Sequence, residues 1–348
     1  MNNIEYRILG AAGIKVPAMG IGTVAWGEKL VGYGKKFTRD DLFKAYKTSL
    51  DAGLNFFDTS ESYGGGVSEQ LLGEFHRHDG RPIVVATKFS PAKIYDPSTR
   101  LSAKDIVSTL EGSLKRLMVD KVDLYQLHYP VARHKLNKYL DAMAETVKSG
   151  KAKAVGVCNF NTELMMYAHE YFAKKNIQLA SNQVGYNLLH RIPETNGMLT
   201  ACEELDIALI AILPLGEGVL TGKYRVGGDS HPSNLRNIAK VTQLDIFKDG
   251  DPSPLLRRLF TKPYMLQREK LEPLFELLDR ISQKYNATIS QVALNWLIAS
   301  NPRVIPIPGE KNARQAAANA ATLGWKMTAE EFESISQAES AIRKSLQG

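Results

Sequence analysis

The sequence predicts one α/β domain over residues 1–348, folded as a closed (β/α)8 TIM barrel, because eight short apolar runs alternate with amphipathic helical patterns. Its 44% apolar content can bury a large core. No change in composition marks a linker, and the rhythm of strand and helix is regular. A closed barrel is therefore favoured over a doubly wound open sheet.

The apolar runs rich in Val, Ile and Ala define the strands, and helical periodicity with capping residues defines the helices. Thr38 is placed to cap the first helix, and Ser102 with Asp105 has the spacing of a capping box. The predicted strands are 19–23, 55–60, 83–89, 122–129, 154–160, 180–187, 208–215 and 303–309. The predicted helices include 40–52, 102–118, 138–148, 162–175, 289–299 and 312–323.

Two segments depart from the alternation. Residues 6–20 hold a glycine-containing turn between two alternating stretches, which predicts an N-terminal β-hairpin that caps the bottom of the barrel. Residues 225–265 are long, polar and rich in Gly and Pro, which predicts a long loop after strand seven, over the mouth of the barrel.

Charge and cysteine content exclude several classes of protein. The net charge of +7 is scattered, so no nucleic-acid partner is expected. No apolar run reaches the length of a membrane span. Cys158 and Cys202 form no CxxC pair, which argues against a disulfide framework and against a metal site. We expect a cytoplasmic protein, and a plastid location stays open if a transit peptide has been removed.

Four chemically active residues stand at or just beyond strand ends. Asp58, Lys88 and His128 end three predicted strands, and Tyr63 follows Asp58 in the next loop. Each has an ordinary explanation: a helix cap, a surface charge, a core histidine and a half-exposed ring. Barrel enzymes collect their reactive groups at the carboxyl ends of the strands, so the four together indicate an active site.

At these positions the chain resembles the aldo-keto reductase family, and within it the branch of potassium-channel β-subunit-like and plant or cyanobacterial reductases. The similarity spans nearly the whole chain. The matching segments are GLNFFDTSESYGGGVSEQLLGEF, VVATKF, VDLYQLHYP, GKAKAVGVCNF, SNQVGYNLLHR, PLGEGVLTGKY and VIPIPGEKNARQAAANAATLGW.

The resemblance implies the reduction of an aldehyde or ketone by a catalytic tetrad. Tyr63 would donate a proton to the carbonyl oxygen, and Lys88 would lower the pKa of its phenol. Asp58 would hold Lys88, and His128 would donate a hydrogen bond to the carbonyl. The hydride must come from a cofactor, because no side chain supplies one.

The resemblance also implies NADPH, bound without a Rossmann motif, since no GxGxxG follows a strand. Gly216–Lys223 looks like a phosphate loop, but its glycine spacing is wrong and Tyr224 stands where Ser or Thr is needed. Lys311 and Arg314 favour NADPH over NADH, while Glu310 works against it. The implied cofactor residues are Thr23, Asp58, Cys158, Asn159, Gln183, Ile212, Leu213, Pro214, Leu215, Lys223, Gly309, Lys311, Gln315 and Asn319.

The chain departs from the family pattern at three positions. Ile212 and Leu213 stand where an aromatic residue and Ser are usual, so ring stacking on the nicotinamide is lost. Cys158 replaces a Ser, and Ala318 replaces an acidic residue that contacts adenine. These changes leave the tetrad intact and affect the expected cofactor contacts.

Substrate identity is the least determined property. Trp26, Phe89 and Tyr129 follow strands one, three and four and are predicted to line a pocket for a carbonyl of modest size, with rim packing as the alternative. Besides a working reductase, two alternatives stay open: a nicotinamide-binding, redox-sensing regulatory subunit with slow turnover, and an interaction scaffold. The sequence does not indicate the oligomeric state.

Overall fold

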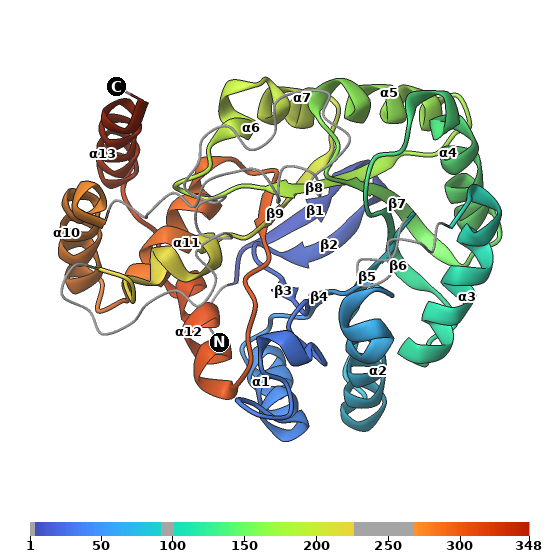
Figure 1. The fold of residues 1–348 in the computed structure, drawn as a ribbon, viewed down its shortest axis with the longest axis horizontal. Helices are drawn as coiled ribbons and strands as arrows, with labels where there is room; N and C mark the ends of the chain where they lie inside the picture. The colour runs from blue at the N-terminus through green and yellow to red at the C-terminus, as the bar shows by residue number, and fades with distance from the viewer. Residues whose placement is uncertain (1–3, 92–100, 226–267, 348) are drawn as a thin grey trace.

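The computed structural model describes residues 4–91, 101–225 and 268–347, and in it eight parallel strands form one sheet. The strands neighbour one another in chain order from β3 to β10. Backbone hydrogen bonds from Gly20 to Pro306 (2.9 Å) and from Gly22 to Pro308 (3.0 Å) join the first strand to the last. The predicted (β/α)8 barrel is therefore confirmed (Figure 1).

Each barrel strand overlaps one predicted segment, although β7 and β8 begin before their predicted segments and most strands are shorter than predicted. The strands are β3 (Ile21–Gly22), β4 (Phe56–Asp58), β5 (Val84–Phe89), β6 (Val122–Leu127), β7 (Ala152–Cys158), β8 (Leu179–Gly185), β9 (Ala208–Ile212) and β10 (Val304–Pro306). The helices are α1 (Arg39–Asp51), α2 (Val67–Asp79), α3 (Ile106–Leu117), α4 (Arg133–Lys148), α5 (Thr162–Ala173), α6 (Ile192–Thr195), α7 (Met198–Glu204), α10 (Arg268–Lys284), α11 (Ile289–Ser300), α12 (Ala313–Ala321) and α13 (Ala329–Gln347).

The predicted helix caps are present. The Thr38 side chain accepts from the backbone N–H of Asp41, and the Asp41 carboxylate accepts from the backbone N–H of Thr38 at 2.8 Å. Ser102 and Asp105 form the same reciprocal pair at the 3-10 turn that leads into α3. Both pairs satisfy N–H groups that the first helical turn leaves without a partner.

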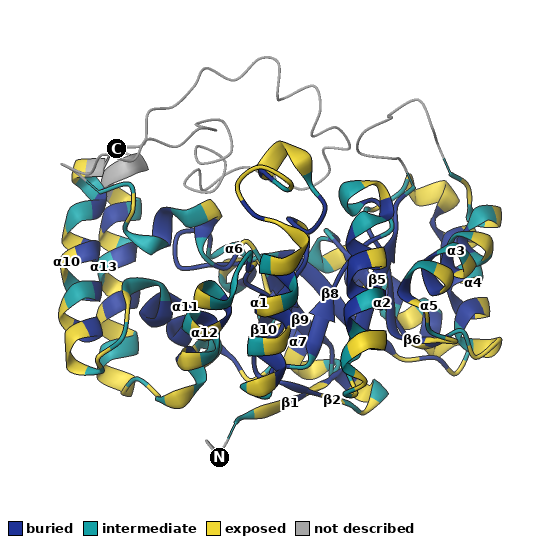
Figure 2. Cartoon of the chain, turned by 90° about the horizontal axis from the view of Figure 1, so that it is seen from below, coloured by how far each residue is buried: buried dark blue, intermediate teal, exposed yellow. Residues whose placement is uncertain are grey.

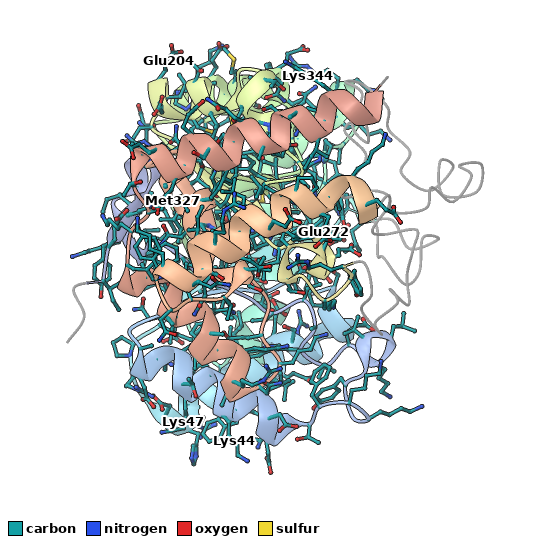
Figure 3. All side chains as sticks on the ribbon, turned by 90° about the vertical axis from the view of Figure 1, so that its left-hand side faces the viewer. Lys44, Lys47, Glu204, Glu272, Met327 and Lys344 are labelled. Carbon is teal, nitrogen blue, oxygen red and sulfur yellow. The ribbon has the colours of Figure 1, made fainter. Side chains whose placement is uncertain are left out.

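Two helices outside the predicted set, α10 and α13, run side by side on the outer surface (Figure 3). Their inner layer is α11, whose Trp296 stacks on Phe332 of α13 with ring centroids 5.5 Å apart. The indole N–H of Trp296 donates to the hydroxyl of Ser336 at 2.9 Å. This buried aromatic contact fixes the last helix against the barrel.

The predicted N-terminal hairpin is confirmed as β1 (Tyr6–Leu9) paired antiparallel with β2 (Ile14–Pro17). It lies across the ring of strands in Figure 1 and at the lower end of the barrel in Figure 2. Leu9 and Val16 are fully buried and join the apolar cluster of the barrel interior. The hairpin thus closes the bottom of the barrel with side chains.

The barrel interior has an apolar lower layer and a polar upper layer. Because side chains alternate along a strand, residues two positions apart point to the same side. Phe56, Ala86 and Leu124 lie in the interior apolar cluster, and Asp58, Lys88 and Gln126 stand two positions further along the same strands. Strand alternation therefore carries one acid, one amine and one amide into the barrel at its carboxyl end.

The long loop predicted at 225–265 after strand seven lies outside the described residues apart from Arg225. Arg225 pairs with Glu272 and Asp279 of α10. Among the described residues, no helix combines the length and the apolarity needed to cross a membrane.

We expect Leu9→Ala to lower the free energy of unfolding by about 2–5 kcal/mol, because it removes buried methyl groups from the bottom of the barrel and leaves a cavity. Chemical denaturation followed by circular dichroism measures this loss. The neighbouring Ile8→Ala, at a 42% exposed position, is the control and should change stability by less than about 0.5 kcal/mol. Equal effects of the two substitutions would contradict a packed barrel floor.

Candidate active site

A buried ion pair lies at the centre of the barrel mouth. Lys88, from the end of β5, is fully buried and donates through Nζ to Oδ1 of Asp58, at the end of β4, over 2.5 Å. The same Nζ donates to the backbone carbonyl of Thr59 at 2.8 Å and to the hydroxyl of Tyr63 at 3.1 Å. Its three protons are therefore all directed to oxygen atoms.

The second oxygen of Asp58 is also satisfied. Oδ2 accepts from Nε2 of Gln183 at 2.8 Å and from Nε2 of Gln126 at 3.1 Å. The strand register shifts between β7 and β8 at Val155 and Gly156, and beyond this irregularity Gln183 pairs with Cys158. Removing a carboxylate from water is costly unless such partners replace the lost hydration.

Tyr63 opens the short 3-10 turn Tyr63–Gly66 that follows β4. Gly64, Gly65 and Gly66 all have positive φ angles, which a residue with a Cβ atom adopts only under strain. This turn directs the phenol back over the strand ends, where its hydroxyl meets Lys88 and its ring meets His128 edge-on at 5.9 Å.

His128 follows β6 and is held on several sides. Its backbone N–H donates to the carbonyl of Phe89 at 2.9 Å, and its own carbonyl accepts from the side chain of Asn159 at 3.0 Å. Its ring stacks on Tyr129 with centroids 4.4 Å apart and planes at 12°. The structure therefore brings Asp58, Tyr63, Lys88 and His128 together.

Burial and charge set the protonation states in this cluster. Burial is the largest single effect on Lys88 and lowers its pKa, but the charges of Asp58, Tyr63 and Cys158 and the hydrogen bond to Asp58 together outweigh burial and raise that pKa above its ordinary value. Burial raises the pKa of Tyr63, and the charge of Lys88 offsets only part of this rise. Burial and the charge of Lys88 hold the pKa of His128 well below its ordinary value. At neutral pH the cluster thus holds an ammonium, a protonated phenol and a neutral imidazole.

The expectation that Lys88 brings the phenol pKa below its ordinary value is therefore wrong for the protein without ligand. The direction of the Lys88 effect is as expected, but desolvation of the Tyr63 phenolate is the larger effect. The phenol is consequently a proton carrier rather than a pre-ionised base.

Two predicted substrate residues are core residues instead. Trp26 has no exposed surface, lies against Phe57 and Phe75, and donates through its indole N–H to the backbone carbonyl of Glu310 at 3.0 Å. Phe89 directly follows Lys88, so strand alternation turns it away from the interior, and it packs against Tyr139.

The pocket-lining role predicted for Trp26 and Phe89 is thus corrected, because both side chains are shielded from the mouth. Tyr129 stays a candidate, since it is only partly buried beside His128. Val24, two residues before Trp26, is 57% exposed and is the rim residue that the sequence reasoning missed. Gln126 was also missed, although its position two residues before His128 on the same strand could have identified it.

A tight glycine-containing turn follows β9 near the mouth. Gly216, Glu217 and Gly218 have consecutive positive φ angles of 56°, 52° and 93°, and the backbone N–H groups of Gly216 and Gly218 donate to the carbonyls of Leu213 and Leu215 at 2.9 and 3.0 Å. A Cβ added at Gly218 would lie 2.7 Å from Nζ of Lys223, so the Lys223 ammonium folds over this loop. Burial is the main cause that lowers the pKa of Lys311, and the positive charges of Lys223 and Lys36 lower it further. These three cations therefore lie near one another.

The other predicted cofactor residues lie on the barrel mouth or next to it. Thr23 is buried, and its hydroxyl donates to the backbone carbonyl of Asp58 at 2.9 Å. Asn159 has a positive φ of 61°, and its side chain contacts the sulfur of Cys158 at 3.3 Å. Burial raises the pKa of the Cys158 thiol to about 12, so it stays protonated and unreactive.

The strand β9 ends in a strained segment. Ile212 is partly buried, and Leu213 is 44% exposed with a positive φ of 54°. Asn187 donates to the carbonyl of Leu213 at 2.9 Å and so stabilises this conformation. Pro214 is buried and Leu215 is partly buried, so this segment offers an apolar edge beside the Gly216–Gly218 turn.

The segment after β10 leads into α12. Gly309 is exposed, and the backbone N–H of Lys311 donates to Oε1 of Gln315 at 2.8 Å. Asn319 is buried and donates to Oε2 of Glu310 at 3.5 Å. The carboxyl group of Glu310 is itself fully buried and accepts from Ser49 of α1 at 2.7 Å. Glu310 therefore faces the protein interior rather than a ligand phosphate, which removes the predicted argument against NADPH.

Comparison with known proteins identifies the family. The profile of the Aldo/keto reductase family matches residues 18–340. The chain belongs to this family. Aldo/keto reductases are oxidoreductases that act on carbonyl groups, and the family match covers every barrel strand described above.

Curated relatives agree with this assignment over most of their length. Pyridoxal reductase, chloroplastic, of Arabidopsis thaliana is 33% identical over 332 residues, which cover 91% of this chain and 82% of the relative. L-glyceraldehyde 3-phosphate reductase of Escherichia coli K12 is 27% identical over 327 residues, which cover 92% and 88%.

Solved aldo/keto reductases share the fold. The glycerol dehydrogenase AKR11B4 of Gluconobacter oxydans superposes with a TM-score of 0.77 at 25% identity, covering 97% of this chain and 95% of its own. The thermostable aldo-keto reductase Tm1743, solved with the inhibitor epalrestat, superposes with a TM-score of 0.70 at 27% identity, covering 96% and 100%.

Glu310 generates a prediction about pH and stability. Burial raises the pKa of this carboxyl to about 7, so between about pH 4.5 and 7 the folded protein binds more protons than the unfolded chain. Stability contributed by the protonated acid is full below pH 4.5 and is lost as the pH rises through 7. We expect Glu310→Gln and wild type to have the same free energy of unfolding at pH 4.5. At pH 8 we expect that of Glu310→Gln to be higher by on the order of 3 kcal/mol.

Urea denaturation of both proteins at the two pH values measures the difference. The exposed Glu333→Gln on α13 is the matched control for loss of one carboxyl group. A stability gain that does not depend on pH would contradict the assignment of a buried, titrating Glu310.

Proposed function

We propose that the protein reduces an aldehyde or ketone to an alcohol with NADPH, and that Tyr63 donates the proton. The observation that carries the proposal is the position of one buried ammonium, Lys88, between the carboxylate of Asp58 (2.5 Å) and the hydroxyl of Tyr63 (3.1 Å). This is the arrangement that a phenol needs to act as an acid, because a phenolate formed at Tyr63 would face a fixed positive charge.

The direction of the pKa shifts supports this role. The phenol is protonated at rest, since burial raises the pKa of Tyr63. When the carbonyl oxygen gains negative charge, the proton of Tyr63 passes to it. Lys88 stabilises the resulting phenolate at a distance that needs no rearrangement. Asp58, held by Gln126 and Gln183, keeps the ammonium in place.

His128 would orient the substrate. Its pKa is depressed by burial and by Lys88, so the ring is neutral and can donate one hydrogen bond to a carbonyl oxygen. The edge-on contact of its ring with Tyr63 brings donor and acid to the same side of the mouth. Tyr129 stacks on the ring and limits its rotation.

The residues around the barrel mouth have the chemistry to bind the phosphates of a dinucleotide. The Lys223 ammonium beside Gly218 matches a pyrophosphate, and the cations Lys311 and Lys36 match a further phosphate. When bound, a dihydronicotinamide supplies the hydride that no side chain provides. Thr23, Cys158, Asn159, Gln183 and the apolar edge Ile212–Leu215 would hold the nicotinamide end. Gly309, Gln315 and Asn319 would hold the adenosine end.

The names of two relatives support reduction as the direction of the proposed reaction. The Arabidopsis relative is called a pyridoxal reductase and the E. coli relative an L-glyceraldehyde 3-phosphate reductase, and both names specify reduction of an aldehyde. Solved aldo/keto reductases of Klebsiella pneumoniae contain NADP and NADPH. We place the protein in the cytoplasm or a plastid, the latter because the Arabidopsis relative is chloroplastic.

Loss of the phenol tests the proposal. We expect Tyr63→Phe to lower kcat for a carbonyl panel that includes 4-nitrobenzaldehyde and methylglyoxal by about 10²- to 10⁴-fold, because the proton donor is gone. NADPH oxidation at 340 nm measures the rate, and NADPH fluorescence measures binding, which should persist. Retention of wild-type turnover in Tyr63→Phe would exclude Tyr63 as the acid.

The same assay separates the reductase from the regulatory alternative. A nicotinamide-binding subunit would oxidise bound NADPH slowly with every carbonyl of the panel, and a scaffold would bind no NADPH. The intact polar cluster around Lys88 favours the reductase over both.

The cationic cluster predicts cofactor preference. We expect Lys311→Ala to weaken NADPH binding by about ten- to a hundredfold, the value of a charge-assisted hydrogen bond to phosphate, and to change NADH binding less. Fluorescence titration with each cofactor measures both constants. Lys326→Ala, which removes an exposed lysine paired with Glu5, is the control. Equal losses for the two cofactors would contradict a role for Lys311 at the 2′-phosphate.

A further inference from the structure

The imidazole of His128 is surrounded by serine hydroxyls that the catalytic scheme does not use. Oγ of Ser90 lies 2.7 Å from Nδ1, and Oγ of Ser60 lies 3.4 Å from the same atom. Ser62 links the two, with its Oγ 2.9 Å from that of Ser60 and 3.4 Å from that of Ser90. The three serines are buried, so these contacts are shielded from water.

We propose that Ser90 is a positioning residue that holds His128 as the Nε2–H tautomer by donating its hydroxyl proton to Nδ1. This inference rests on the proposed function, in which His128 donates a hydrogen bond to the substrate carbonyl. The nitrogen that the serines do not touch is Nε2, and only a proton on Nε2 lets the neutral ring act as a donor there.

Counting donors and acceptors decides the direction of the hydroxyl chain. With Nδ1 as an acceptor, Ser90 and Ser60 can both donate to Nδ1, and Ser62 can donate to Ser60, so every hydroxyl proton has an acceptor. The backbone N–H of Ser62 also donates to Oγ of Ser60, at 3.3 Å. The hydroxyl protons of Ser60 and Ser90 are therefore both directed to the imidazole, and Ser90 is the nearer donor.

The opposite tautomer leaves the chain unsatisfied. If Nδ1 carried the proton, Nδ1 could accept from neither Ser60 nor Ser90. The three hydroxyls would then share two contacts among themselves, and one buried hydroxyl proton would have no acceptor among the hydrogen bonds of the described residues. A buried donor without a partner loses its hydration without compensation, so the Nε2–H form is the favoured one.

The surrounding charges keep the ring neutral, which the tautomer argument requires. Lys88 repels a second proton, and burial adds to this effect. Tyr63 meets the ring edge-on and stays protonated, because burial raises its pKa, and Tyr129 stacks on the ring. Glu61 accepts from the backbone N–H of Ser90 at 3.1 Å and so fixes Ser90 at the end of β5.

The tautomer of His128 can be measured in the protein without cofactor or substrate. Histidine-selective ¹⁵N labelling and two-dimensional NMR at pH 7.5 report which nitrogen carries the proton, and His128→Asn assigns the signal. We expect a protonated Nε2 and an unprotonated Nδ1 in wild type. A protonated Nδ1, or a doubly protonated ring, would overturn the proposal whether or not any variant folds.

Variants extend the test. We expect Ser90→Ala to populate the Nδ1–H form and to lower kcat by about 10- to 100-fold, the effect typical of lost partners of functional histidines. Ser90→Thr, which keeps the hydroxyl, should restore the Nε2–H signal. Ser62→Ala is the matched control, because Ser62 does not touch the ring, and it should retain the Nε2–H form. An unchanged tautomer in Ser90→Ala would refute the role of Ser90.

The outcome is independent of the reductase assay. A Ser90-dependent Nε2–H tautomer in a protein that reduces no carbonyl would overturn the proposed function and leave the tautomer assignment standing. Normal carbonyl reduction by a protein whose His128 carries its proton on Nδ1 would overturn the tautomer assignment and leave the proposed function standing.

Discussion

The buried contact between Lys88 and Asp58 is the constraint on which the active site depends. An ammonium and a carboxylate without water are tolerated only when every hydrogen-bonding position is filled, and here Thr59, Tyr63, Gln126 and Gln183 fill them. Thr59 and Tyr63 come from the segment after β4, Gln126 from β6 and Gln183 from β8. The barrel must therefore be closed and correctly registered before the pair can exist.

The pair also explains the protonation of its neighbours. One positive charge in a desolvated site opposes the protonation of His128 and lowers the cost of ionising Tyr63. Because Asp58 raises the pKa of Lys88, that charge persists across the physiological range. The protonation states of Lys88, Tyr63 and His128 are thus set by a single electrostatic arrangement rather than by each residue separately.

The lower end of the barrel interior is apolar and contributes to stability, whereas the upper end is polar and holds the candidate active site. Below the polar layer, Leu9 and Val16 of the hairpin complete an apolar interior with Phe56 and Leu124. Above it, hydrogen bonds replace apolar packing as the interaction that fixes side-chain positions. This division allows the upper layer to carry buried charges, because the lower layer and the outer helices supply the hydrophobic burial that folding requires.

Much of this could be anticipated from local patterns. The alternation of strands and helices, the caps at Thr38 and Ser102, and the hairpin depend on interactions between near neighbours in the chain, and all were confirmed. The tetrad could be proposed because strand ends meet at one rim of a parallel barrel. Side-chain alternation along the strand also indicates that Phe89 points away from the barrel interior, and the predicted pocket-lining role did not take this into account.

Other features depend on contacts between distant segments, and only the folded chain shows them. The burial of Trp26 by Phe57 and Phe75, the inward carboxyl of Glu310 and the net rise of the Tyr63 pKa all follow from desolvation by residues far apart in sequence. Likewise, three unremarkable serines become a proton-orienting chain only when three segments converge on Nδ1 of His128. Residue types and their spacing were sufficient to propose where the chemistry lies along the chain, whereas three-dimensional packing determined which groups lose water, and loss of water sets their protonation.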